Sequence, residues 1–119
     1  MEMENNEFFK NKNILITGGS GFIGTYLVKR LVSYNANVTV VDNYRRSSKD
    51  RLSSLKSKIN FLELDIKEIS KYENQIGKLD SIFHLAAING TKNFYTHSQE
   101  VLDVALRGTL EIFDLALKC

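Results

Sequence analysis

Short apolar runs alternate along this chain with longer stretches in which hydrophobic residues recur at helical spacing. The runs are rich in β-branched residues and end at glycine or polar clusters, which is typical of strands buried within a sheet. Four strands are predicted, over residues 13–17, 37–42, 59–64 and 79–85. Helical patterns follow them, from residue 22, at 50–55, after 65, and from 96 towards 118. This order predicts an α/β fold of the Rossmann type, an incomplete doubly wound parallel sheet with helices on both faces.

Local signals define where three of these helices lie. The first helix is expected to pack on the sheet through an apolar stripe formed by Ile23, Leu27, Leu31 and Tyr34. The spacing of Asp65 and Glu68, and that of Thr96 and Gln99, matches the capping box. We therefore predict that Asp65 and Thr96 each cap the start of a helix.

The last predicted helix carries more apolar surface than one buried face requires. One stripe contains Leu102, Ala105, Leu106, Ile112, Phe113 and Ala116, and a second contains Val101, Val104 and Leu115. We expect the helix to be buried on two sides. The second side would face either a neighbouring helix of the same chain or a second subunit, which would make the protein a homodimer.

Composition narrows the classes of partner. The chain has 119 residues, about one domain on a prior of ~100–200 residues. Its 16 basic and 14 acidic residues are mixed without a basic stripe, which argues against nucleic acid. No apolar run reaches the ~20 residues that cross a membrane.

The acidic, polar start predicts a flexible lead-in over residues 1–11 and a folded unit over 12–119. The single cysteine, Cys119, fits a reducing, cytoplasmic location, and we assign no metal-binding residues.

A glycine-rich turn follows the first predicted strand. The sequence is Thr17-Gly-Gly-Ser-Gly-Phe-Ile-Gly24. A dinucleotide site needs a tight turn here, close approach of the backbone to a pyrophosphate, and close packing of the next helix. A Cβ would obstruct each of these, and glycine has none. Gly18, Gly21 and Gly24 can serve these roles, although G-x-G-x-x-G can also be counted from Gly19. The first helical turn, with Phe22 and Ile23, then directs free N–H groups and the positive end of its dipole at the phosphates. The pattern predicts dinucleotide binding.

An acidic residue closes the second predicted strand. Asp42 follows the glycines at close to the ~20-residue interval at which a carboxylate meets the adenosine ribose. Because this carboxylate would repel a 2′-phosphate, NAD is favoured over NADP. The alternative is that Arg45 and Arg46, just downstream, grip that phosphate, or simply occupy a solvated loop.

Further motifs carry a resemblance to a known family. The glycine turn, Val41-Asp42-Asn43, Leu64-Asp65-Ile66, His84-Leu85-Ala86-Ala87 and Gly108-Thr109 resemble the N-terminal half of the extended short-chain dehydrogenase/reductases, specifically the NAD-dependent nucleotide-sugar epimerases and dehydratases. The resemblance covers about residues 12–118. It implies that Asn43 contacts the cofactor next to Asp42, that Asp65 binds the adenine amino group with Ile66 beside it, and that Leu85, Ala86 and Ala87 line the cofactor. His84 lies within a strand pattern, so we predict a structural role for it.

Two departures from the family bear on activity. Ala105 stands where family members commonly have Asn, which leaves the sugar open. No Tyr in the chain is followed four residues later by Lys, the pair on which the family's chemistry depends. We therefore expect the NAD-binding portion of an enzyme that moves a hydride from a carbon of a nucleotide sugar to NAD, truncated before its catalytic region. The alternative is a non-catalytic NAD(P)-binding or protein-interaction module.

Overall fold

The computed structural model describes residues 7–43, 49–87 and 91–119. Its strands are β1 (Asn13–Thr17), β2 (Asn37–Asp42), β3 (Ile59–Glu63) and β4 (Ser81–His84). The helices are α2 (Phe22–Ser33), α3 (Glu73–Ile76), α4 (Thr91–Thr96) and α5 (Ser98–Lys118), with 3₁₀ helices η1 (Lys49–Leu55) and η2 (Ile66–Tyr72). The predicted alternation of strands and helices is confirmed, with shorter third and fourth strands than the sequence pattern indicates.

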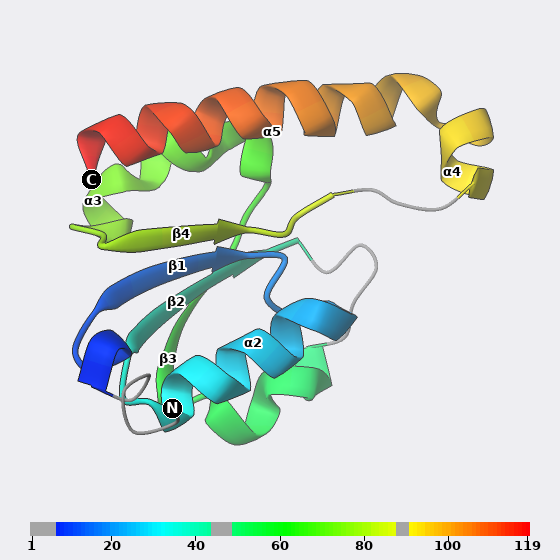
Figure 1. Ribbon diagram of the computed structural model, residues 1–119. Helices are drawn as coiled ribbons and strands as arrows, with labels where there is room; N and C mark the ends of the chain where they lie inside the picture. The colour runs from blue at the N-terminus through cyan, green and yellow to red at the C-terminus, as the bar shows by residue number, and fades with distance from the viewer. Residues whose placement is uncertain (1–6, 44–48, 88–90) are drawn as a thin grey trace.

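The described strands form one parallel sheet in the order β3-β2-β1-β4. The chain moves outward from β1 to β2 and β3, then returns to the other side of β1 for β4 (Figure 1). Ile14 of β1 pairs with Val38 on one side and with Ser81 on the other. The order therefore reverses at β1, and in such sheets ligands bind outside the carboxyl ends of the strands at this point.

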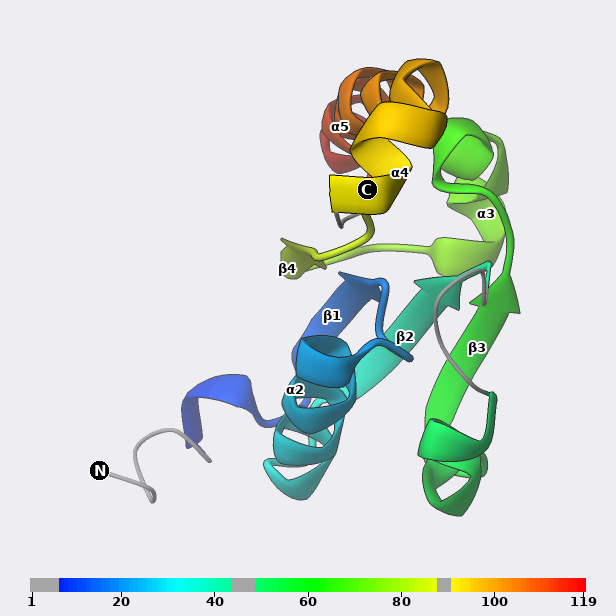
Figure 2. The ribbon, with the colours of Figure 1, turned by 90° about the vertical axis from the view of Figure 1, so that its right-hand side faces the viewer.

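Helices cover both faces of the sheet, as predicted for a doubly wound fold (Figures 1 and 2). Alternate residues of β1 point to opposite faces. Ile14 and Ile16 belong to the core formed with α2 and η1, whereas Leu15 belongs to the core formed with η2, α3 and α5. All three side chains are fully buried. The central strand is thus enclosed on both faces, which explains its continuous apolar run.

Helix α2 buries part of the predicted stripe: Leu31 is buried and Leu27 packs against the core, whereas Ile23 does not. Gly24, Thr25, Val28 and Leu31 are buried, while Ile23 is 70% exposed. The cause is the close approach of Gly24 to the glycine turn, described below, which rotates Ile23 out of the core. The prediction that Ile23 packs on the sheet was wrong.

The two predicted helix caps differ in outcome. The Asp65 carboxylate accepts a hydrogen bond of 2.9 Å from Lys67 N, so the prediction that it caps a helix is confirmed. The prediction for Thr96 was wrong, because residues 91–96 form their own helix and the Thr96 hydroxyl donates to the carbonyl of Lys92 within it. The N-cap of α5 is His97, which makes no side-chain cap bond.

Within the described chain, helix α5 is buried on one side, so the alternative in which a neighbouring helix of this chain covers the second side is wrong, and burial against a second subunit stays a prediction. Gly108, Ile112 and Leu115 face the sheet and η2. The opposite side leaves a row of large apolar side chains exposed, from 55% to 89%: Leu102, Leu106, Leu110, Phe113 and Leu117. We call this row the α5 stripe. No described element covers it, because η2 and the sheet lie on the other side of the helix (Figure 1).

The end of the expected lead-in is attached to the fold. Residues 7–9 form a helical turn, and Phe9 packs against the core beneath α2. Its ring stacks on Tyr34 with centroids 6.1 Å apart, and Asn11 N donates to the carbonyl of Asn35 at 2.9 Å. Residues 7–11 therefore contact the folded unit, residues 1–6 lie outside the described part of the chain, and the flexible lead-in stays a prediction.

Candidate functional site

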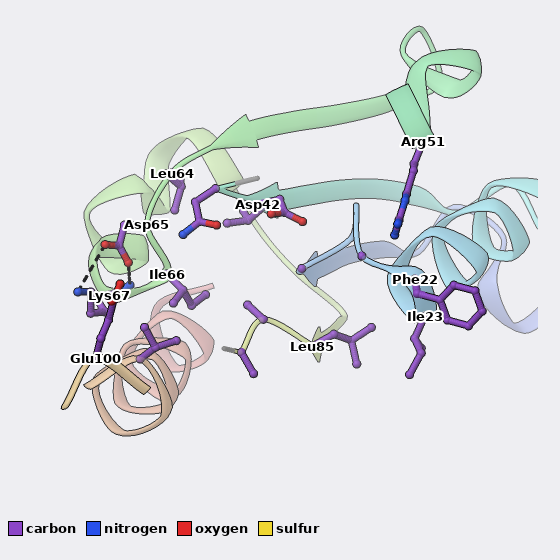
Figure 3. Close-up of a pocket in the computed structure, with 18 residues that line it drawn as sticks. Phe22, Ile23, Asp42, Arg51, Leu64, Asp65, Ile66, Lys67, Leu85 and Glu100 are labelled. Carbon is purple, nitrogen blue, oxygen red and sulfur yellow. Dashed lines mark hydrogen bonds and ion pairs between the residues drawn. The ribbon is translucent and has the colours of Figure 1, made fainter. Parts of the chain in front are cut away.

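A pocket of about 490 Å³ lies at the carboxyl ends of β1, β2 and β4, where the strand order reverses (Figure 3). The structure brings every residue that the sequence assigned to the site into its lining: Gly18, Gly21, Phe22, Ile23, Gly24, Asp42, Asn43, Asp65, Ile66, Leu85, Ala86 and Ala87. Arg45 and Arg46, the alternative phosphate ligands, lie outside the described residues.

Six lining residues were not identified from the sequence: Val41, Arg51, Leu64, Lys67, Glu100 and Val104. Val41, Leu64 and Lys67 adjoin predicted site residues and could have been found by that adjacency. Glu100 and Val104 belong to one face of the first turns of α5. Arg51 comes from η1 and matches no motif, so only the path of the crossover between β2 and β3 reveals it.

The glycine turn is too tight for side chains at two of the positions that line the pocket. Gly18 has a φ of +70°, and a Cβ there would lie 2.9 Å from the backbone N of Ala86. A Cβ on Gly24 would lie 2.3 Å from the carbonyl oxygen of Gly18. These contacts press the start of α2 against the end of β1. Gly19 is also enclosed, since a Cβ would meet Val40 Cγ1 at 2.5 Å, but it does not line the pocket.

The start of α2 opens into the pocket. Its N-cap is Gly21, which makes no side-chain cap bond, and the first turn contains no acidic residue. The first amides of a helix have no carbonyl partner within it and carry partial positive charge. Phe22 and Ile23 are 72% and 70% exposed in this turn. The arrangement suits an anion that accepts hydrogen bonds from backbone N–H groups.

Asp42 ends β2 at the opposite side of the turn. It is buried, with 9% of its surface exposed, and its Oδ2 accepts a hydrogen bond of 3.0 Å from Ser20 N. Next to it, Gly18 N donates to the carbonyl of Val41 at 2.7 Å. The carboxylate is therefore fixed against the glycine turn, in the position from which it can accept hydrogen bonds from a ribose.

Thr17 joins the ends of β1 and β4. Its carbonyl accepts from Leu85 N at 3.1 Å, and its hydroxyl accepts from Ala86 N at 3.1 Å. The hydroxyl also lies 2.7 Å from Nδ1 of His84, to which it can donate its proton. Burial lowers the pKa of His84, which favours the neutral ring that this bond requires. His84 does not line the pocket, and its contact with Thr17 holds the Leu85–Ala86 wall in place.

The far end of the pocket is polar and linked to α5. Lys67 Nζ lies 3.7 Å from Asp65 Oδ2 and 3.3 Å from Asp103 Oδ2 (the ion pair with Asp65 is drawn in Figure 3). Arg107 Nε in turn lies 2.8 Å from Asp103 Oδ1. Glu100 and Val104 complete this wall. The network ties η2, with Asp65 and Ile66, to the first turns of α5.

The polar side chains that line the pocket are those of Asp42, Asn43, Arg51, Asp65, Lys67 and Glu100. Among the described residues that line it, none is Tyr, Ser, Thr, Cys or His. Tyr26, on α2, does not line it either. Over residues 7–43, 49–87 and 91–119, no group of His, Cys, Asp and Glu is arranged to hold a metal ion. None of the helices in these ranges combines the length and apolar character needed to cross a membrane.

Solved structures share this fold. An epimerase, Mth375, from Methanothermobacter thermautotrophicus superposes with a TM-score of 0.87 at 29% identity, over 98% of this chain and 34% of that one. The enzyme WbmF of Bordetella bronchiseptica, solved in complex with NAD+, gives a TM-score of 0.81 at 26% identity, over 91% of this chain and 33% of that one.

Two relatives with known names are similar in sequence to most of this chain. UDP-N-acetyl-alpha-D-glucosaminuronate decarboxylase of Bacillus cytotoxicus is 36% identical over 107 residues, which cover 90% of this chain and 33% of that protein. UDP-glucuronic acid decarboxylase 6 of Arabidopsis thaliana is 35% identical over 117 residues, which cover 96% of this chain and 33% of that protein. The chain thus spans about a third of the length of these relatives. The model of the NAD dependent epimerase/dehydratase family matches residues 14–119. With its parallel sheet and its glycine turn, the chain belongs to the NAD dependent epimerase/dehydratase family.

Proposed function

We propose that this chain forms the NAD-binding portion of an enzyme that acts on a nucleotide sugar. The observation that carries the proposal is the convergence of the glycine turn, Asp42 and the Leu85–Ala87 wall on one pocket at the reversal of strand order. The relatives named above are an epimerase and UDP-sugar decarboxylases, and one solved relative holds NAD+. Residues 12–119 are proposed as the cofactor-binding unit.

The residues present fit a dinucleotide. The space that a Cβ on Gly18 or Gly24 would fill is needed to bring the backbone of the turn to the pyrophosphate. In this proposal the first amides of α2 bind the pyrophosphate, the Asp42 carboxylate accepts hydrogen bonds from the adenosine ribose, and Asp65 and Ile66 bind adenine. Ala86 and Ala87, whose side chains are short, would lie beside the nicotinamide. Bound NAD would supply a hydride acceptor, and these residues would bind and orient it.

In the family that the sequence resembles, the reaction depends on a Tyr followed four residues later by Lys, and no Tyr in this sequence is so placed. Moving the protons of a sugar hydroxyl requires an acid or base within hydrogen-bond reach of the reacting atom. We propose that the groups that bind and deprotonate the sugar belong to the portion of the enzyme that the relatives contain beyond the matched third. A nucleotide sugar is then the substrate class of the whole enzyme. We place the enzyme in the cytoplasm, where such sugars and NAD are both available.

We further propose that the protein is a homodimer that pairs through α5. The support is the α5 stripe, whose side chains recur at helical spacing over the length of the helix and are at least 55% exposed. Exposed apolar patches of this kind mark interaction surfaces.

Calorimetric titration with NAD tests the binding proposal. The wild-type chain should bind NAD, and Asp42→Ala should weaken binding by about tenfold or more, because hydrogen bonds to a charged group are lost. Asp114→Ala is the matched control, since Asp114 is exposed on α5 and does not line the pocket. A folded chain that does not bind NAD, or equal affinities for wild type and Asp42→Ala, would contradict the proposal.

A further inference from the structure

Arg51 reaches the glycine turn from η1 and lines the same pocket as Asp42 (Figure 3). Its Nη1 lies 3.5 Å from the carbonyl oxygen of Ser20. The backbone N of the same serine donates to Asp42 Oδ2 at 3.0 Å. A guanidinium and a carboxylate therefore both attach to one residue of the turn, the first through its carbonyl and the second through its amide.

The Arg51 guanidinium has hydrogen-bonding capacity to spare. A contact of 3.5 Å is a weak hydrogen bond, and a guanidinium has five N–H donors. Within the part of the chain that the structure describes, Arg51 makes no ion pair with a carboxylate. Its side chain is exposed and extends towards the turn rather than away from it (Figure 3). Arg51 is therefore a cation with donors directed at the pocket.

We infer that Arg51 is a specificity-determining residue that binds a phosphate on the adenosine ribose, so that the pocket accepts NADP as well as NAD. The inference rests on the proposed function, in which Asp42 receives that ribose. A carboxylate alone disfavours a 2′-phosphate by charge repulsion. A guanidinium that contacts the same serine offsets this repulsion and pairs with phosphate oxygens in a fork geometry. NAD remains the tighter ligand, because Asp42 is buried and fixed, and NADP binds measurably.

The pyrophosphate is the other phosphate that Arg51 could contact. The pyrophosphate can already bind the first amides of α2, which follow the N-cap residue Gly21. Arg51, by contrast, is attached to Ser20, whose amide is bonded to Asp42. Because both side chains contact Ser20, the guanidinium lies on the side of the turn where Asp42 lies, which favours the 2′ position over the pyrophosphate.

Parallel calorimetric titrations with NAD and NADP test the inference at one fixed, low salt concentration. The proteins are wild type, Arg51→Met and Arg51→Lys. Lys56→Met is the matched control, because it removes one exposed positive charge next to η1 and does not line the pocket. Circular dichroism and thermal unfolding confirm that each variant folds. Lysine at position 51 preserves the charge and backbone packing, which keeps the test valid if methionine impairs folding.

The expected result is a selective loss. Arg51→Met should weaken NADP binding by about tenfold or more and change NAD binding by about threefold or less. Arg51→Lys should fall between wild type and Arg51→Met for NADP, since lysine retains the charge without the fork. Lys56→Met should match wild type with both ligands.

Other results overturn the inference. If wild type binds NAD and not NADP, Arg51 does not offset Asp42. If Arg51→Met weakens both ligands equally, Arg51 contacts a group that they share, such as the pyrophosphate. If it weakens neither, Arg51 does not bind phosphate. Failure of the wild-type protein to bind either dinucleotide would instead contradict the proposed function, so the two failures are distinguishable.

Discussion

Gly24 sits against the carbonyl of Gly18 so closely that a Cβ on Gly24 would come within 2.3 Å of that oxygen. The contact joins the first turn of α2 to the end of β1. It brings the amides at the start of α2 beside the pocket, and it turns Ile23 outward from the sheet. One backbone contact therefore sets both the packing of α2 and the shape of the candidate phosphate site.

Gly24→Ala is predicted to destabilise the fold and to abolish NAD binding. The added methyl group would also lie 2.8 Å from Gly19 Cα, so the backbone must move, and overpacking of this kind costs about 1–3 kcal/mol. Urea unfolding measures the stability and calorimetry measures NAD binding.

Gly77→Ala is the matched control for that substitution. Gly77 has a φ of +74°, a Cβ added there would meet nothing within 4 Å, and the residue lies outside the pocket. With a ψ of −164°, Gly77 lies in a backbone region that essentially only glycine adopts, so the variant should lose about 1–3 kcal/mol through backbone strain and should retain NAD binding. Equal NAD affinities in wild type and Gly24→Ala would show that the close approach of α2 is not required for the site.

Thr17→Val is predicted to lower stability by about 1–3 kcal/mol, since it leaves Ala86 N and Nδ1 of His84 without their shared hydroxyl partner. Valine has nearly the same shape, so loss of packing contributes little. The measurement is urea unfolding near neutral pH. A variant as stable as wild type would mean that the hydroxyl does not hold β4 to β1.

The pKa of His84 predicts how stability depends on pH. Burial lowers this pKa in the folded state from the ordinary 6.5, so the unfolded chain binds more protons as pH falls through that value. The contribution of His84 is present above the unfolded pKa and is lost as pH falls towards the folded pKa. Unfolding free energies measured from about pH 8 to about pH 5 should therefore fall more steeply in wild type than in His84→Gln. Parallel curves for the two proteins would contradict this assignment.

The chain's own pattern predicted much of this fold. The alternation of apolar runs with helical stretches was enough to predict the four strands. A strand that is enclosed on both faces, such as the one with Ile14, Leu15 and Ile16, is apolar at every position and can be recognised as a continuous apolar run. The glycines and Asp42 were identified because backbone approach and ribose recognition need those residue types at that spacing.

The parts that the sequence did not predict depend on tertiary contacts. Arg51 lines the pocket only because the crossover after β2 carries η1 back to the turn. The cap expected at Thr96 failed because its hydroxyl bonds within α4. Apolar residues such as Leu106 were assigned to a buried face, yet periodicity does not tell whether a neighbour is present to cover them.

The α5 stripe predicts association between copies of the protein. Leu106→Glu, which places a charge in the middle of the stripe, should convert a dimer into a monomer without loss of folding, because Leu106 is 64% exposed in the single chain. Sedimentation velocity measures the association state, and circular dichroism confirms the fold. Lys118→Glu, which also adds an exposed negative charge on α5 but lies outside the stripe, is the control. A wild-type protein that sediments as a monomer at all concentrations would contradict the proposed dimer.

The most direct test of NAD binding at this pocket is to follow the backbone amides of the ¹⁵N-labelled chain by NMR as NAD is added. Concentration-dependent shifts are expected at Gly21, Phe22 and Ile23, together with Asp42 and Ala86, with little change along the exposed side of α5. Absence of shifts at saturating NAD, or shifts confined to residues outside the pocket, would contradict it.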